Sequence, residues 1–433
     1  MGLGNILAAN TVYRVLNIGA TFILTVLLSR LMGAAGYGLF SLIIVSTTIY
    51  NLISGFGAEA GITYHGAAGT FNTTKLLSFV FIIVIVQLGF LFLIGLIYKF
   101  IYHQNWFGLY NLWPVIFIFL SISLTDKYNA LFYGYHKYSL SNKIIAIGNL
   151  LCLLAFMILY FFSTTINFQN YLELYAVINL LQAIFIVVTF HKTTRLPVVV
   201  VKPLRNEWKI FFSYSLITAL ANFIQFLAYR VDYWILNYYK GEEALGVYSV
   251  AVKLVQFFWI IPVLFAGMLF PGTAAKRNEF NEEAMRSLLR VMNSFNLITG
   301  VVTFFMINWF IPFFFGNEYA ESTAAFQWLL PGIFLFCNTS VLAAYFAGKN
   351  LLTVNLITSL TGFAVIVLLD FLLIPGFGTQ GAAISSSIGY SIATGYSIWK
   401  YLEVSGASLS EMFIIKKSDW ERIIAIGWTD LLR

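Results

Sequence analysis

Charged residues are scarce in this chain. Asp, Glu, Lys and Arg make up only 10% of its 433 residues, whereas hydrophobic types make up 60%. A soluble globular protein carries about a quarter charged residues, enough to cover a surface that faces water. This chain cannot cover such a surface, so its excess apolar surface must face lipid. The net charge of +7 fits positive loops beside a bilayer and does not indicate nucleic acid binding.

Cysteine and histidine are also rare. Cys152 and Cys337 both lie inside apolar runs, where we interpret them as small core residues. The histidines lack the close spacing of a zinc site; they are His65, His103, His136 and His191. The phosphate-binding pattern Gly-x4-Gly-Lys-Ser/Thr is missing as well, which argues against ATP hydrolysis. These absences predict a protein that is not an enzyme and holds no metal or other cofactor.

Long apolar runs dominate what is present. A helix needs about 20 mostly apolar residues to cross a bilayer, whereas a membrane β-barrel would alternate apolar and polar residues. The predicted fold class is therefore all-α, a polytopic membrane protein with about twelve transmembrane helices. The expected spans are 6–29, 38–60, 76–98, 112–134, 143–162, 171–190, 209–236, 247–270, 289–315, 325–347, 352–373 and 379–401.

Basic residues are distributed unevenly over the loops between these spans. With the amino terminus placed in the cytoplasm, nearly all loop Lys and Arg fall on the cytoplasmic side. The opposite side holds Arg30, Lys99 and Lys240. This asymmetry follows the positive-inside rule, and an even number of spans places both termini in the cytoplasm.

A basic loop near the midpoint predicts the domain organisation. Residues 191–209 contain Pro197 and Pro203 and are typical of a linker. We expect an N-terminal lobe over 1–200, a C-terminal lobe over 201–402, and a cytoplasmic tail over 403–433, with six helices in each lobe. The tail mixes charged and apolar residues, which favours an amphipathic helix on the membrane surface. A partly disordered tail is the alternative.

An internal repeat supports two similar lobes. The pattern Gly-x4-Gly-aliphatic-aromatic-Ser occupies 33–41 and recurs 208 residues later at 241–249. Glycines permit a tight turn between two helices, so each copy predicts a helical hairpin. Two halves with the same orientation are related by an axis along the membrane normal. The substrate path is then expected between the halves.

Polar side chains recur on one face of the helix before each hairpin, at spacings of 4, 3 and 4. Lipid offers such groups no partners, so they must face other helices or a wet cavity. Hydrogen bonds between packed helices are one interpretation for any single Asn or Thr. For the paired sets we favour a cavity lining. The residues are Asn10, Arg14, Asn17 and Thr21 in the first half, and Thr218, Asn222, Gln225 and Tyr229 in the second.

Ionisable residues inside spans are costly and indicate function. The interior bases outnumber the deep acids, which suits an anionic substrate such as a phosphate. The predicted substrate-binding bases are Arg14, Lys127, Arg230 and Lys253. Asp126 and Asp232 are candidates for coupling to H⁺ or Na⁺. Glu59 and Asp370 fall at the ends of spans, where we interpret them as a rim residue and an interfacial anchor.

Several short motifs resemble the O-antigen flippases, the polysaccharide-biosynthesis branch of the multidrug/oligosaccharidyl-lipid/polysaccharide exporter superfamily. The stretch 29–41 is similar to the first hairpin of that family, and 230–232 with 246–251 is similar to its seventh and eighth helices. Pro271 fits the end of the eighth helix, and 374–384 is similar to the final hairpin. The resemblance extends to about Tyr401.

The resemblance implies a multi-pass protein of the bacterial inner membrane. Its substrate would be an undecaprenyl-diphosphate-linked oligosaccharide, moved between leaflets by alternating access in the biosynthesis of a surface polysaccharide such as O-antigen. The implied partners are the bilayer, this lipid-linked substrate and polysaccharide assembly proteins.

A multidrug or cation antiporter of the same superfamily would need an acid-dominated cavity. The Gly-x3-Asp-Arg signature that is usual in major-facilitator transporters is missing from this sequence, which argues against that class. The short outer loops argue against a membrane-bound polymerase or acyltransferase.

Overall fold

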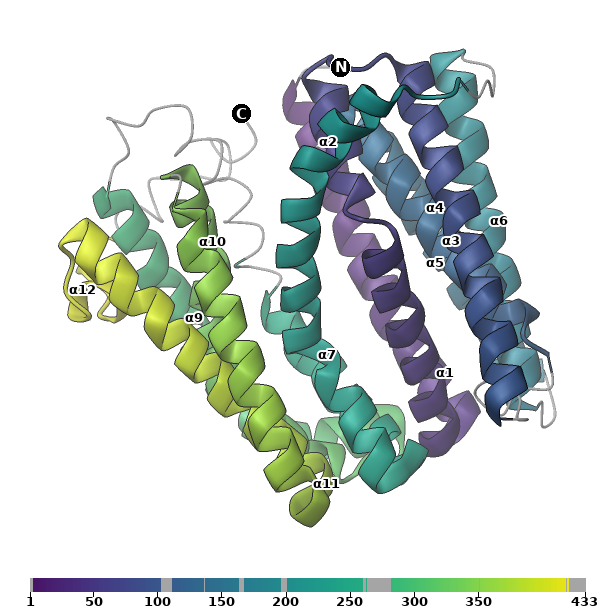
Figure 1. The fold of residues 1–433 in the computed structure, drawn as a ribbon. Helices are drawn as coiled ribbons and strands as arrows, with labels where there is room; N and C mark the ends of the chain where they lie inside the picture. The colour runs from purple at the N-terminus through teal and green to yellow at the C-terminus, as the bar shows by residue number, and fades with distance from the viewer. Residues whose placement is uncertain are drawn as a thin grey trace. The chain divides into compact units, whose positions relative to one another are not determined.

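The structure is a computed structural model that describes residues 3–102, 111–135, 137–162, 167–195, 201–259, 262, 282–349, 351–417 and 419. Within these ranges the regular secondary structure is helical (Figure 1). The helices are α1 Leu3–Ser54, α2 Ala58–Ala67, α3 Thr73–Tyr102, α4 Trp113–Gly134, α5 Tyr138–Phe162, α6 Phe168–Thr194, α7 Arg205–Val255, α9 Glu282–Phe315, α10 Ser322–Gly348, α11 Leu352–Ser405 and α12 Ser410–Phe413, with 3₁₀ turns η2 Gln256–Trp259 and η3 Asn317–Tyr319.

Three helices are continuous in hydrogen bonding but bend back at a glycine. Gly33 in α1 has φ 66° and ψ 175°, and Gly241 in α7 has φ 81° and ψ −177°. Gly378 in α11 has φ 56° and ψ −128°. Residues with a side chain avoid these backbone angles. Each long helix therefore contains two helical segments, and the two hairpins predicted from the repeat turn at equivalent glycines with nearly the same backbone conformation.

Eight of the helices in the described ranges are long and apolar enough to cross a membrane. They comprise Val12–Ser54, Thr73–Ile97, Trp113–Gly134, Ser139–Phe162, Phe168–Thr194, Met285–Phe315, Ser322–Gly348 and Leu352–Ser405. The first and last of these contain a hairpin each. Helix α7 includes Arg230 and Asp232 in its first segment and Lys240 beside its bend. The all-α polytopic membrane fold is confirmed.

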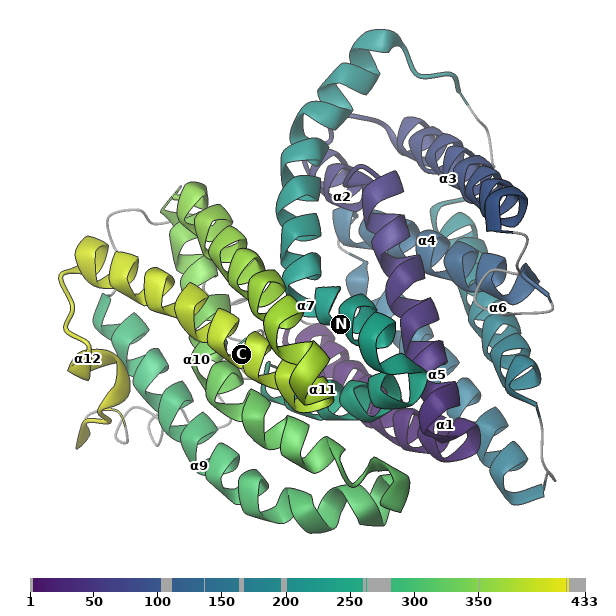
Figure 2. The same cartoon turned by 60° about the horizontal axis from the view of Figure 1, so that its bottom comes forward.

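The chain divides into two compact units, one up to Phe223 and one from Ile224 onward. In the first unit α4 lies against α6 and α1 lies against α5 (Figures 1 and 2). The division falls inside α7, downstream of the predicted lobe boundary at 200. The physical reason is that the start of α7 packs on the first unit, where Phe211 joins a buried cluster with Ile62 and Phe79.

In the second unit α10 packs along α11 and also contacts α9. The short α12 lies against α9, with Met412 completely buried. Beyond it, Asp419 bonds to Arg290 and Ser287 of α9 at 2.6 Å each. The surface helix expected in the tail over 403–433 stays a prediction: the described part, 403–417 and 419, contains the short α12 after the end of α11, and residues 418 and 420–433 lie outside the described ranges.

Candidate functional site

A helix break organises the polar centre of the first unit. The second segment of α1 ends at Ser54, and α2 begins at Ala58 after a turn in which Phe56 and Gly57 have φ values of 49° and 70°. A side chain on Gly57 would come within 2.3 Å of the Ser215 carbonyl oxygen of α7. Glycine is therefore required for this close approach. Discontinuous helices are common at transporter binding sites because they present polar backbone inside the membrane.

Lys127 occupies the interior next to this break. Its side chain is 0% exposed. Its ammonium nitrogen lies 3.2 Å from Glu59 Oε1, 3.2 Å from Asn51 Oδ1 and 2.9 Å from Ser123 Oγ. Glu59 stands in the first turn of α2, where the positive end of the helix dipole favours a carboxylate. The Lys127 charge is thus offset by an ion pair and two further hydrogen bonds.

Two amides link this ion pair to the neighbouring helices. Asn51 Nδ2 donates to Asp126 Oδ2 at 3.0 Å. Gln87 Nε2 donates to Ser54 Oγ at 2.9 Å and to the Asn51 carbonyl oxygen at 3.3 Å. Ser123 in turn donates to Gln87 Oε1 at 2.8 Å. The network joins α1, α3 and α4, so it fixes the orientation of the groups around the break.

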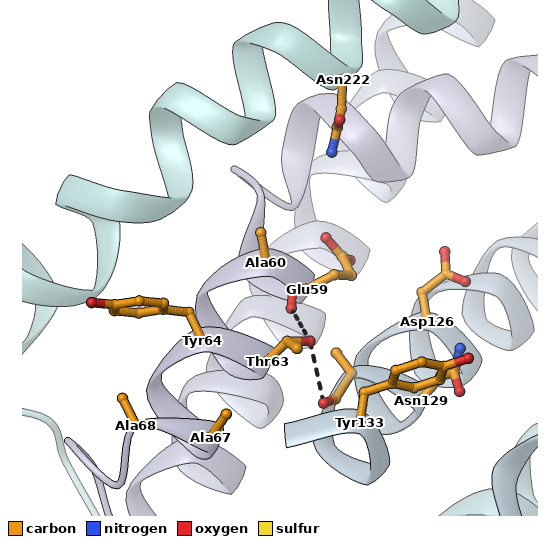
Figure 3. A pocket seen from close by; sticks show the side chains of 11 residues that line it. Glu59, Ala60, Thr63, Tyr64, Ala67, Ala68, Asp126, Asn129, Tyr133 and Asn222 are labelled. Atoms are coloured by element: carbon orange, nitrogen blue, oxygen red, sulfur yellow. Dashed lines mark hydrogen bonds between the residues drawn. The ribbon is translucent and has the colours of Figure 1, made fainter. Parts of the chain in front are cut away.

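A cavity of about 860 Å³ lies against this network, and all its lining residues belong to the first unit. Glu59 and Asp126 line it together with Asn222 of α7, and Figure 3 shows Asn222 facing these carboxylates across the open space. The phenol of Tyr64 is on α2, and that of Tyr133 is on α4. The complete lining is Glu59, Ala60, Thr63, Tyr64, Ala67, Ala68, Asp126, Asn129, Ala130, Tyr133 and Asn222.

Arg14 contacts Tyr133, one of the residues that line the same cavity. Its side chain is exposed, and Nη2 lies 3.4 Å from the Tyr133 hydroxyl. Arg14 therefore remains available to an anion. Lys127 differs from the expectation drawn from the sequence. Its ammonium is buried and faces Glu59, because burying the charge without a partner would be far more costly than burying the pair.

The paired sets of polar residues in α1 and α7 include both hydrogen bonds between packed helices and a cavity lining. Asn17 accepts from Asn149 Nδ2 of α5, and Gln225 accepts from Ser359 Oγ of α11 at 2.6 Å, so both amides join helices. Asn222 is exposed and lines the cavity. Asn10 and Thr218 lie in α1 and α7, but their side chains are outside the described part of the structure.

The second unit holds the other predicted ionisable residues. Asp232 is 2% exposed and accepts hydrogen bonds from Tyr248 at 2.5 Å and from Ser386 at 3.2 Å. Arg230 donates to the Tyr233 hydroxyl at 3.1 Å and also lies over its ring. Lys253 is half-buried. Both hydroxyls bond Asp232 Oδ2, whereas Oδ1 is buried and has no hydrogen-bond partner among the described residues. Arg230 and Lys253 are both partly exposed.

The structure corrects the roles predicted for Glu59 and Asp370 and adds Asn51, which the sequence did not single out. Glu59 is the ion-pair partner of Lys127 rather than a simple rim residue, and Asn51 bridges Lys127 and Asp126. Asp370 is completely buried, so it is not an interfacial anchor. The pair of glycines at 55 and 57, inside an expected span, and the polar Asn51 one turn earlier were the available signals. No group of three His, Cys, Asp or Glu side chains positioned for a metal ion occurs among the described residues.

Comparison with known proteins places these features in a family. A sequence model with the description "Polysaccharide biosynthesis protein" matches residues 27–324. No curated protein sequence matches the chain. The fold is similar to "Lipid II flippase MurJ, inward closed conformation", with a TM-score of 0.71, 14% identity, and coverage of 98% of this chain and 92% of that one.

Two further solved structures share the fold. An inward-facing multidrug resistance MATE transporter of the MOP superfamily has a TM-score of 0.64, 15% identity, and coverage of 92% of this chain and 95% of its own. A MOP superfamily transporter from Pyrococcus furiosus has a TM-score of 0.62, 16% identity, and coverage of 93% and 94%. At these identities the likeness establishes the fold alone.

Proposed function

Because the chain belongs to the polysaccharide biosynthesis protein family, we propose that it is a flippase for a polyprenyl-diphosphate-linked oligosaccharide. Transport would proceed by alternating access across the bacterial inner membrane and would supply the synthesis of a surface polysaccharide such as O-antigen. The observation that carries the proposal is the family match over residues 27–324, joined to a polar cavity inside a unit of apolar helices. Ionisable residues that line a cavity at membrane depth indicate a functional site.

Arg14, Arg230 and Lys253 are the bases that we assign, each as a separate candidate, to the diphosphate. Arg14 is exposed, and the other two are only partly buried. A guanidinium can hold two phosphate oxygens at once, and an ammonium acts as a point charge. Lys127 is assigned a different task, since its ion pair with Glu59 fixes the wall of the cavity.

Asp232 is our candidate for coupling transport to H⁺ or Na⁺. Its carboxylate is enclosed among hydroxyl donors from Tyr248 and Ser386. Binding a cation or a proton would neutralise a buried charge and change the packing preference of α7 against α11. Asp126 is the second candidate, although its exposure in the cavity also suits contact with substrate.

One observation favours a second function. The cavity wall carries Glu59 and Asp126, and an acid-lined cavity suits the cationic substrates of a multidrug antiporter. The two functions make opposite demands on Arg14. A diphosphate needs an accessible base, whereas a cationic drug is repelled by one.

Reconstitution in liposomes tests the proposal. A fluorescent polyprenyl-diphosphate oligosaccharide is placed in both leaflets, and a membrane-impermeant quencher reports how fast the inner pool becomes accessible. We expect protein-dependent exchange of the label, absent from empty liposomes. An ethidium-efflux assay on the same liposomes is the comparison. Ethidium transport without exchange of the lipid-linked glycan would overturn the flippase proposal in favour of the antiporter.

A further inference from the structure

The cavity of the first unit has the wrong charge for a phosphate. Its lining residues with a formal charge are Glu59, which is paired with Lys127, and Asp126, and both are acids. Lys127 belongs to the same network, but its ammonium is enclosed by three partners and 0% exposed. A diphosphate placed here would meet carboxylates at short range, and like charges in such a site repel strongly. Some other part of the substrate must occupy this space.

The same lining is well suited to hydroxyl groups. Asp126 accepts a hydrogen bond from Asn51 at Oδ2, and the Asp126 side chain is exposed to the cavity. Carboxylates accept hydrogen bonds, and the amides of Asn129 and Asn222 both donate and accept. A sugar ring carries hydroxyls around its edge, and each hydroxyl can both donate and accept a hydrogen bond. Charge-assisted hydrogen bonds of this type are roughly twice as strong as neutral ones.

Two phenols complete the lining. Tyr64 is 48% exposed, and its ring is held edge-on against His65 with centroids 5.1 Å apart. The hydroxyl of Tyr133 is held by Arg14 at 3.4 Å. A tyrosine offers an apolar ring face and a polar tip, which match the C–H face and the hydroxyl edge of a sugar. The volume of about 860 Å³ is within the usual range of ligand pockets.

We propose that this cavity, formed by α2, α4 and the start of α7, is the subsite for the saccharide part of the lipid-linked substrate, and that the sugar held there carries no acidic group. The proposal rests on the flippase function proposed above. Asp126, Asn222 and Tyr64 contact the sugar, and Glu59 is a wall residue that Lys127 holds in position. Arg14, which contacts the lining residue Tyr133, holds the diphosphate next to the sugar subsite.

Binding to protein in lipid nanodiscs tests the subsite with three probes. These are a polyprenyl diphosphate without sugar, the same lipid carrying an N-acetylhexosamine, and the same lipid carrying a hexuronic acid. We expect the wild-type protein to bind the N-acetylhexosamine probe at least about tenfold more tightly than either other probe, an effect of one or two charge-assisted hydrogen bonds.

Variants of the lining separate the subsite from the phosphate contacts. Tyr64→Ala and Asp126→Asn should each weaken binding of the N-acetylhexosamine probe by about tenfold and leave the sugar-free probe unchanged. Asp126→Asn should also remove the discrimination against the hexuronic acid. Phe161→Ala and Glu243→Gln, at exposed positions outside the cavity, are matched controls for the aromatic and the acidic change.

The outcomes for the subsite and for the flippase function differ. Two results would overturn the subsite while leaving transport of a lipid-linked glycan in place. One is that the wild-type protein binds all three probes with equal affinity. The other is that Tyr64→Ala and Asp126→Asn weaken the binding of every probe equally. Tighter binding of ethidium than of any glycan probe, lost in Asp126→Asn, would instead assign the cavity to a cation. Absence of lipid-linked glycan exchange in liposomes would overturn the proposed function itself.

Discussion

The ammonium of Lys127 lies 3.2 Å from the Glu59 carboxylate, across the gap between α4 and α2. The lysine is completely buried, whereas the glutamate side chain is 28% exposed. The pair therefore joins the interior of the first unit to the wall of its cavity. It also connects the broken helix to the polar network of Asn51 and Gln87, so several properties of the protein depend on it.

The first prediction concerns this pair. Lys127→Ala should lower the free energy of unfolding by about 3 kcal/mol, because it leaves Glu59 and Asn51 without their buried partner. Thermal unfolding in detergent measures the change. The double variant Lys127→Ala with Glu59→Ala should recover part of the loss, since it removes both charges. Equal stability of Lys127→Ala and the wild-type protein would contradict the structural role assigned to this lysine.

Arg14→Ala should behave differently. Its guanidinium is exposed and makes one long contact, to Tyr133, among the described residues, so the stability of the protein should change by less than about 0.5 kcal/mol. Exchange of the lipid-linked glycan in liposomes should be abolished, because the diphosphate loses the most exposed of the three bases assigned to it. Arg30→Ala, at the other end of the same helical segment, is the matched control and should retain transport. Normal exchange in Arg14→Ala would remove this arginine from the phosphate site.

A third prediction addresses the hairpin turns. Gly241 has φ 81° and no heavy atom within 4 Å of an added Cβ, so alanine there meets conformational strain without a steric clash. Gly241→Ala should lower stability by about 1–3 kcal/mol. Gly395 also has free space around it but lies at an ordinary helical position, and Gly395→Ala should be neutral or stabilising by about 0.5–1 kcal/mol. Thermal unfolding of the two variants, measured side by side, checks the contrast.

The fourth prediction concerns ion coupling. Asp232→Asn keeps the shape of the side chain and one hydrogen-bonding oxygen for Tyr248, but it cannot bind or release a proton. Exchange of the lipid-linked glycan in this variant should no longer respond to an imposed H⁺ or Na⁺ gradient, whereas the affinity for the sugar-free polyprenyl diphosphate should stay the same. Measuring exchange with each gradient applied alone identifies the ion. An unchanged gradient response would exclude Asp232 as the coupling group.

The final prediction uses the contact between the tail and α9. Hydrogen bonds from Arg290, then from Ser287, hold the pKa of Asp419 well below its usual range. Because the folded-state pKa is lowered, this contact stabilises the protein at neutral pH and is lost as the pH falls below about 4 toward the folded value. Hydrogen exchange of residues 406–417 should accelerate in that acidic range. In Asp419→Asn the exchange should already be fast at pH 7, and slow exchange there would contradict the assigned contact.

The sequence by itself determined the fold class and the internal repeat. Twelve apolar segments and few charges permit only a helical membrane protein, because a helix satisfies its own backbone hydrogen bonds in lipid. The glycines at 33 and 241 marked both hairpins, since a tight turn between helices needs positive φ wherever it occurs. These properties are local, so they can be inferred from spacing and residue type.

Only the tertiary structure decided what the interior charges do. Lys127 and Asp126 are neighbours in sequence, yet one faces the ion pair with Glu59 and the other faces the cavity. Their partners, Glu59 and Asn51, come from segments more than 60 residues away. Whether a buried charge binds a ligand or an ion-pair partner depends on which groups the packed helices place within about 4 Å of it. The spacing of residues along one helix does not predict which residues of other helices lie that close.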